Sequence, residues 1–402
     1  MGKTPTQPVM TDRNTWSVFL VFLRLGLTSF GGPIAHLGYF RDEFVVRRRW
    51  LSERGYADLV ALCQFLPGPS SSQVGIALGL TRAGYGGALA AWLGFTLPSA
   101  IALILFASLL LHQSNLSPGM LQGLKIAAVA VVAQAVWGMA RSLCPDRLRV
   151  TIMTFSAITV LLLASIWSPL LVLVVAGLVG VALLKPAIGL EQDVLSVPVS
   201  RRTGALALSL FFALLIGLPL LVALMPGQLL ALVDSFYRVG SLVFGGGHVV
   251  LPLLQTETVD TGLVNVDMFL AGYGATQAVP GPLFTFAAFL GAAMDSGLPG
   301  WVNGLLCLVV IFLPSFLMVI GILPFWEQLR HNLKMQAALA GINAAVVGLL
   351  LAALYQPMWT TAIRGPGDFA LALAALVALT FWKLPPWLVV AATAGIGWAL
   401  QG

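Results

Sequence analysis

The sequence predicts an all-α polytopic membrane protein built from two inverted-topology repeats, with broken, re-entrant half-helices that meet near the bilayer midplane. Three observations predict it: a very apolar composition, a series of apolar stretches of helix length, and helix-breaking motifs that occur twice. The charged fraction of the 402 residues is 9%, against roughly 25% in a soluble protein. The hydrophobic fraction is 59%. This composition excludes a soluble globular protein, a nucleic-acid binder and a disulfide scaffold.

The apolar stretches are the expected membrane spans. A spanning helix needs roughly 20 mostly apolar residues, and the shortest stretches are tight fits. The single long polar linker, 186–203, separates two halves of the chain. The expected spans are roughly 86–112, 118–142, 149–166, 168–185, 204–225, 298–325, 334–356, 366–383 and 386–401.

Four further apolar segments are interrupted by glycine and proline, which end or kink helices. Two interruptions lie in the first half of the chain, at Gly31-Gly32-Pro33 and Pro67-Gly68-Pro69. The other two lie in the second half, at Gly245-Gly246-Gly247 and Pro280-Gly281-Pro282. We expect each of these segments to be a pair of half-helices.

The interruptions recur in register. The motif Phe-x-Arg-x5-Phe-Gly-Gly at 22–32 returns 214 positions later (238 minus 24), and Glu43 returns as Glu257 at the same displacement. Gln-x2-Pro-Gly-Pro at 64–69 returns after 213 positions (277 minus 64), and Leu-Pro-Ser at 97–99 after 216 (313 minus 97). Such self-similarity indicates a duplicated unit. We assign 1–185 to the first repeat, 186–226 to a linker and connecting helix, and 227–402 to the second repeat.

The charge distribution predicts that the repeats face opposite ways. If each broken segment returns to its own side, five spans separate the repeats, and an odd number inverts them. Of the 21 lysines and arginines, three lie in apolar segments, and 17 of the other 18 then fall on the inner side. This places the N-terminus in the cytoplasm. If the broken segments instead crossed fully, Arg47-Arg48-Arg49 would lie outside unless paired crossings restored it.

Unwound backbone in a bilayer is tolerated only where it is buried in protein or lines a cavity. Paired half-helices in matching places of two repeats therefore favour a transporter's midplane site over simple kinks. The half-helix after Pro69 begins Ser70-Ser71-Ser72, and its counterpart after Pro282 reaches Thr285. Free amides and the helix dipole at such a start suit an oxyanion. The alternative is N-capping by serine.

Intramembrane polar side chains are the other candidates for binding substrate. Arg24 and Arg238 each precede a glycine break by six residues, and a guanidinium suits a tetrahedral oxyanion. The alternatives are packing against carbonyl groups, snorkelling to the surface and, for Arg238, an ion pair with Asp234 four residues earlier. Gln64 and Gln277 could donate to an anion or tie the unwound backbone.

Four titratable residues near the breaks are candidates for proton coupling: Glu43, Glu257, His36 and His248. For Glu43 the alternative is a salt bridge with Arg47. Lys125, in an apolar span, is expected to snorkel.

These motifs resemble the chromate ion transporter family across the whole chain. The resemblance rests on Phe-x-Arg-Leu-Gly-x3-Phe-Gly-Gly-Pro at 22–33, Gln-x2-Pro-Gly-Pro at 64–69 and again at 277–282, and Phe-Gly-Gly-Gly-His at 244–248. It implies a long-chain, two-repeat transporter of chromate, and of sulfate as an alternative, in a bacterial cytoplasmic membrane. Family members are associated with chromate efflux and resistance.

The expected function is secondary active efflux of chromate, with no cofactor and no metal. Neither a nucleophile–base pair nor a metal cluster nor an ATPase phosphate loop is recognisable, so we do not expect an enzyme. The alternatives are a transporter of sulfate or another anion, a channel, and a membrane-embedded enzyme or scaffold. A proton or another ion could be coupled, and a homodimer stays open.

Overall fold

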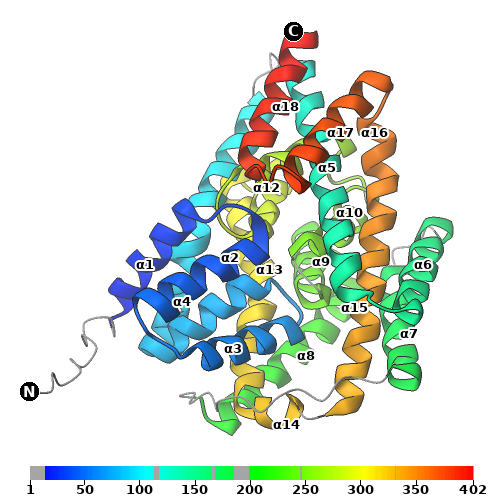
Figure 1. The fold of residues 1–402 in the computed structure, drawn as a ribbon. Coiled ribbons are helices and arrows are strands. Elements are labelled where there is room, and N and C mark those ends of the chain that lie inside the picture. Colours follow the sequence, from blue (N-terminus) through cyan, green and yellow to red (C-terminus); the bar gives the residue numbers. More distant parts are fainter. Residues whose placement is uncertain are drawn as a thin grey trace, which may run out of the picture.

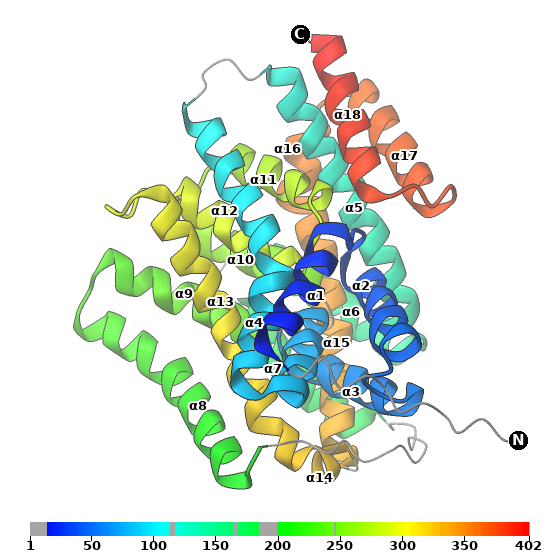
Figure 2. The same cartoon turned by 90° about the vertical axis from the view of Figure 1, so that its left-hand side faces the viewer.

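The computed structural model describes the chain in the stretches 14–112, 117–163, 168–184, 199–244, 247–330 and 332–401. Within these stretches every regular element is a helix and no strand occurs. The helices form one elongated bundle, with the C-terminus at one end and α14 (Trp326–Arg330) at the other (Figures 1 and 2). The prediction of an all-α polytopic membrane protein is confirmed.

Five helices of the described chain are long and apolar enough to cross a bilayer. They arise where apolar sequence runs for more than 20 residues without a strong break. Proline inside α4, α8 and α13 does not end these helices. The five are α4 (Ser70–His112), α5 (Pro118–Leu143), α8 (Arg201–Leu224), α13 (Gly300–Ile322) and α15 (Leu333–Ala353). Short turns extend two of them: η5 (Leu323–Phe325) follows α13, and η6 (Leu354–Trp359) with α16 (Thr360–Ala362) follows α15.

Four of the expected spans are shorter helices. They contain 15 or 16 residues, about 24 Å at 1.5 Å per residue, and so fall short of a hydrocarbon core of about 30 Å. Hydropathy reports apolar length and not helix length: one of the four ends at Thr380 although Phe381 and Trp382 continue the apolar sequence. The four are α6 (Arg147–Leu162), α7 (Ser168–Leu183), α17 (Pro366–Thr380) and α18 (Pro386–Gln401).

Each pair of short helices packs on a long helix from the other half of the chain. The pair α17–α18 lies against α5, and the pair α6–α7 lies against α15 (Figure 1). Glycines make both contacts close. A Cβ added to Gly123 of α5 would meet the carbonyl of Thr393, and one added to Gly341 of α15 would meet the carbonyl of Ala176.

The segments with glycine and proline clusters are pairs of short helices. In the first half α1 (Thr15–Thr28) precedes α2 (Gly32–Arg41) and η2 (Asp42–Arg47), and α3 (Glu53–Phe65) precedes α4. The second half follows the same order, and Gly245 and Gly246 lie outside the described residues. Its elements are α9 (Gln228–Leu242), η3 (Gly247–Val249), α10 (Val250–Thr258), α11 (Val266–Ala278), η4 (Leu283–Thr285) and α12 (Phe286–Ala293). A last short helix, α14 (Trp326–Arg330), precedes α15.

Helix α4 is two helices joined at a kink. Ala83 (φ −139°, ψ 30°) and Gly84 (φ 62°, ψ −155°) have non-helical backbone angles. The first helical segment therefore covers residues 70–82 and the second covers 85–112. The first segment is almost entirely buried, so its N-terminus opens inside the bundle, among α1, α2 and α13 (Figure 2).

Candidate functional site

The helix breaks of the two halves meet at one cavity. It has a volume of ≈ 660 Å³. Gly31, Gly68 and Ser70 line it from the breaks of the first half, and Gly247 and His248 line it from the second. The C-terminal half of α5 forms much of the remaining wall, including Val131, Gln134, Ala135, Gly138, Met139, Ser142 and Leu143. The cavity therefore joins two glycine breaks that lie 216 positions apart in the sequence (247 minus 31).

The lining suits an anion because it contains polar groups and no carboxylate. Among the lining residues none is Asp, Glu, Lys or Arg. Hydrogen-bond donors come from the side chains of Gln64, Ser70 and Asn343. Two other polar side chains of the lining already donate to carbonyl groups: Ser142 Oγ to Gly138, and Gln134 Nε2 to Leu379. Gln64, Gly138 and Ser142 are exposed, so the cavity is open beside the C-terminal half of α5.

The start of α4 adds backbone donors. Ser70, Ser71 and Ser72 are 8%, 2% and 3% exposed. The first backbone hydrogen bond of the helix runs from the Gln73 N–H to the Pro69 carbonyl, at 2.9 Å. The amides that precede it are the free N–H groups at the positive end of the helix dipole. Such a terminus attracts an anion without a formal charge.

Several buried polar atoms around this helix start have no hydrogen-bond partner in the described part of the chain. They are the Oγ atoms of Ser29, Ser72 and Ser315 and the Oε1 atom of Gln73. Their residues are all at most 3% exposed. Buried polar groups are normally paired. None of these four residues is in the cavity lining, so the unpaired atoms lie beside the helix start and not on the cavity surface.

The break before α4 is held by two hydrogen bonds. The Gly68 N–H donates to the Val243 carbonyl at 2.6 Å. The Gln73 side chain turns back and donates from Nε2 to the Pro67 carbonyl at 2.5 Å. Gly68 itself has a φ of +119°, which favours glycine. The unwound backbone is thus held by groups from both halves of the chain.

The second Pro-Gly-Pro break makes the reciprocal contact. The Gly281 N–H donates to the Ser29 carbonyl at 2.9 Å, and Gly281 has a φ of +104°. Ser29 and Val243 are themselves 214 positions apart (243 minus 29). Each half therefore supplies, at its glycine break, the acceptor for the Pro-Gly-Pro break of the other half.

The two histidines lie near the cavity, and one of them, His248, is part of its lining. His36 is fully buried; its Nε2 lies 3.2 Å from the Ser29 carbonyl and its Nδ1 lies 3.4 Å from the Ser71 hydroxyl. His248 lines the cavity, and its Nδ1 lies 2.9 Å from the Tyr273 hydroxyl. His36 thus connects the first glycine break to the start of α4.

The structure separates the remaining predicted residues from this cavity. Arg24 is exposed and forms no ion pair among the described residues. Gln277 is 7% exposed, and its Nε2 atom has no partner in the described chain. Thr285 donates to the Pro282 carbonyl at 2.7 Å. None of these three side chains is in the cavity lining.

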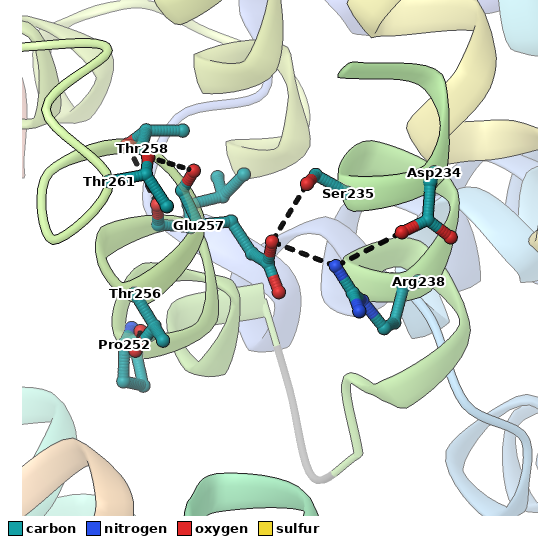
Figure 3. A network of polar contacts seen from close by, with 9 residues as sticks. Asp234, Ser235, Arg238, Pro252, Thr256, Glu257, Thr258 and Thr261 are labelled. Atoms are coloured by element: carbon teal, nitrogen blue, oxygen red, sulfur yellow. Dashed lines mark hydrogen bonds and ion pairs between the residues drawn. The ribbon is translucent and has the colours of Figure 1, made fainter. Parts of the chain in front are cut away.

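Arg238 is engaged by two carboxylates. Its Nη2 atom lies 3.2 Å from Asp234 Oδ2 and 2.9 Å from Glu257 Oε2, and Ser235 donates to the same Glu257 oxygen at 2.7 Å. Figure 3 shows these contacts between α9 and α10. The ion pair with Asp234, expected from the four-residue spacing, is confirmed. A small cavity of ≈ 30 Å³ lies beside Arg238, Thr256 and Glu257.

Glu43, at the equivalent position in the first half, has different partners. It pairs with Arg47 at 3.0 Å, as the spacing predicts, and with Arg48 at 2.6 Å. The segment lies between α2 and α3, outside the apolar spans. Burial alone would raise the pKa of Glu43, but hydrogen bonds from Arg48 and Arg47 more than offset it and hold the pKa below its ordinary value. Glu43 is therefore ionised at neutral pH.

Sequence reasoning missed two features: the α5 residues that line the cavity, and the hydrogen bond from the Gln73 side chain to the Pro67 carbonyl, here called the Gln73 clasp. A signal for the wall is present: Gln134, Gly138 and Ser142 recur every four residues and so form one polar stripe on an apolar helix. Gln73 gives no such signal, because its role depends on the conformation of the break that it holds.

Comparison with known proteins identifies the relatives of this chain. A family model described as chromate transporter matches it over two stretches, residues 16–181 and 230–398. A chromate transport protein of Pseudomonas aeruginosa is 28% identical over 98% of this chain and 94% of its own length. The chromate transport protein of Cupriavidus metallidurans is 26% identical over 98% and 95%. An uncharacterised transporter of Methanocaldococcus jannaschii is 27% identical over 88% and 87%. No solved structure matches the chain.

Proposed function

Because the chain belongs to the chromate transporter family, we propose that it is a secondary active transporter that moves chromate out of the cell across the cytoplasmic membrane. The observation that carries the proposal is the start of α4, where three buried serines precede a cavity whose lining has no carboxylate. Chromate binds there to the free amides and hydroxyls of residues 70–72, with help from Gln64. Relatives named chromate transport proteins support chromate as the cargo.

An inverted arrangement of the two repeats is part of the proposal. The segments between the two sets of breaks are the second part of α4, α5, α6, α7 and α8. Their number is odd whether α6 and α7 each cross the membrane or together form a hairpin that returns. The reciprocal hydrogen bonds of Gly68 and Gly281 support the same symmetry. Two inverted halves around one site can alternate between inward and outward states.

The physical argument for efflux is the membrane potential. One elementary charge gains about 2.3 kcal/mol per 100 mV, so a dianion that leaves a cell with a negative interior gains roughly twice that. Protons are the proposed coupling ion, with Glu43, Glu257, His36 and His248 as the titratable groups near the breaks. Sulfate, a tetrahedral dianion like chromate, is the competing cargo.

Chromate flux in proteoliposomes tests the proposal. Replacing Ser70, Ser71 and Ser72 together by alanine should raise the half-saturating chromate concentration at least about tenfold, since a hydrogen bond to a charged group is worth about 1.5–3 kcal/mol. Ser156→Ala, a buried serine of α6, is the matched control and should leave the flux unchanged.

Four outcomes decide between the alternatives. Absence of chromate flux in the wild-type protein would refute the function. Stronger competition by sulfate than by unlabelled chromate would identify sulfate as the preferred cargo. Normal flux in an Arg24→Gln protein would remove that arginine from the site, and normal affinity in the triple-serine variant would remove the helix start.

A further inference from the structure

The charges in the cluster of Asp234, Arg238 and Glu257, inside the bundle, do not balance. The side chains are 8%, 18% and 11% exposed. One guanidinium faces two carboxylates, so the cluster has a net charge of −1 when both acids are ionised. A buried charge without a partner is costly. Binding one proton makes the cluster neutral.

The contacts leave room for that proton. A single atom, Nη2 of Arg238, bridges both carboxylates, whereas Nε of the same guanidinium is buried and has no hydrogen-bond partner in the described chain. The arginine therefore does not engage either acid in a two-pronged pair. The adjoining cavity of ≈ 30 Å³ is lined by Arg238, Thr256 and Glu257. It is large enough for a water molecule, which can bring a proton to the acids.

The first half of the chain does not reproduce this cluster. The positions equivalent to Asp234 and Ser235 are Leu20 and Val21, 214 residues earlier. Glu43, equivalent to Glu257, is instead neutralised by Arg47 and Arg48. The cluster of one arginine and two carboxylates is thus confined to the second half, although the helix breaks occur in both.

No other charged group compensates the cluster from the helices packed against it. Helix α13 contains no Asp, Glu, Lys, Arg or His, and α8 carries only Arg201 and Arg202, in its first turn. Tyr237, also on α9, donates to the Phe211 carbonyl of α8. His248 precedes α10 and lies against Tyr273. On α15, which also packs against α10, Lys334 is in the first turn and exposed.

A short path connects the cluster to the anion cavity. Arg238 and Leu242 of α9 line the small cavity, and the carbonyl of the next residue, Val243, accepts the Gly68 N–H at 2.6 Å. Gly68 lines the large cavity directly before the serines of α4. A shift of α9 upon protonation would therefore move the acceptor that holds the anion-binding backbone.

From this geometry we propose that Asp234, Arg238 and Glu257 form the proton-binding site that couples proton movement to transport of the dianion. The inference rests on the proposed function. A proton from water forms an O–H bond with a carboxylate oxygen of Glu257 or Asp234. That bond breaks when the proton is released to water on the other side, and no electron is transferred. One cycle carries one proton.

Paired flux measurements test the site. Wild-type proteoliposomes with an internal pH dye should take up protons when chromate moves, and an imposed pH gradient should drive chromate uphill. In Glu257→Gln and Asp234→Asn, the ratio of pH-driven transport to chromate–chromate exchange should fall at least about tenfold, since the coupling free energy is lost. Asp260→Asn, three residues beyond Glu257, is the matched acid control and should keep the ratio.

A second measurement avoids variants that fail to fold. Infrared difference spectra of the wild-type protein, with and without chromate, should contain a carboxylic-acid carbonyl band that changes on binding and that is absent from Asp234→Asn or Glu257→Gln. Chromate flux in the wild type without any proton movement would overturn the proton site and leave the transport function intact. Unchanged coupling in both variants, or an unchanged infrared band, would overturn it as well. Absence of all chromate flux would instead refute the proposed function.

Discussion

At Gly68 and Gly281, both the backbone angle and the neighbouring atoms require glycine. A Cβ added to Gly68 would lie 2.6 Å from both Gln73 Nε2 and Ser315 Oγ. One added to Gly281 would collide with Ser99 Oγ. Ser99 and Ser315 are the serines of the two Leu-Pro-Ser motifs. The repeated motifs therefore contact one another across the two halves, with a serine from one half beside the glycine of the other.

Gly68→Ala is expected to damage the site. A non-glycine residue in an unfavourable backbone region costs about 1–3 kcal/mol, and the methyl group would also displace the Gln73 clasp. We expect a lower melting temperature and weaker chromate flux. Gly217→Ala, in α8 with open space around it, is the control and should be neutral or slightly stabilising. Equal stability of the two variants would show that the break tolerates a side chain.

At this scale the sequence predicts local contacts better than distant ones. The pairs of Arg238 with Asp234 and Glu43 with Arg47 follow from four-residue spacing on a helix, and both are present. The second partner of Arg238, Glu257, lies 19 residues away (257 minus 238) and depends on how α9 meets α10. Spacing alone contains no information on that packing.

Lys125 joins helices α5 and α11 through an ion pair. The sequence predicted a lysine that snorkels along α5 to the surface. It is wrong: the side chain is 5% exposed and its Nζ lies 2.5 Å from Asp267 Oδ1, in the first turn of α11. A buried ammonium needs a partner, and the neighbouring helix supplies one.

The pair should be asymmetric towards substitution. Asp267→Asn would leave a buried ammonium without its counter-ion, whereas Lys125→Met would leave an aspartate that is 63% exposed and solvated. We expect Asp267→Asn to lower the melting temperature in detergent more than Lys125→Met does, by the equivalent of about 1–3 kcal/mol. The double variant should resemble Lys125→Met. The reverse order would mean that the lysine reaches water by another route.

Hydropathy predicts where the helices lie but not how long each helix is. The positions of the helix breaks follow from glycine and proline, which act locally. The early end of α17 does not, because Phe381 and Trp382 continue the apolar sequence beyond Thr380, where the helix ends. Only packing on α5 and α15 distinguishes a short helix against protein from a long one in lipid.

The opening of the cavity indicates which side of the membrane it faces. It is open beside the C-terminal half of α5, which ends at Leu143 next to the basic segment Arg147–Arg149. Basic loops are enriched on the cytoplasmic side. We infer that the cavity faces the cytoplasm in this conformation.

Labelling from each side of the membrane tests this orientation. The native cysteines Cys63, Cys144 and Cys307 are all buried, so a single exposed cysteine can be read against a low background. In Ser142→Cys, a membrane-impermeant maleimide should react in inside-out vesicles and not in right-side-out ones, and chromate should slow the reaction. Reaction only from the outer side would reverse the topology.

The reciprocal hydrogen bonds between the breaks have a consequence for chains of half this length. A protein made of the first half alone would keep the Gly68 N–H and lose its acceptor at Val243, while the Ser29 carbonyl would lose the donor at Gly281. Two such chains could restore both bonds only by associating as an antiparallel pair related by a two-fold axis. The present polypeptide thus resembles a dimer whose subunits have been fused and have since diverged, one keeping the serine run and the other acquiring the acid pair.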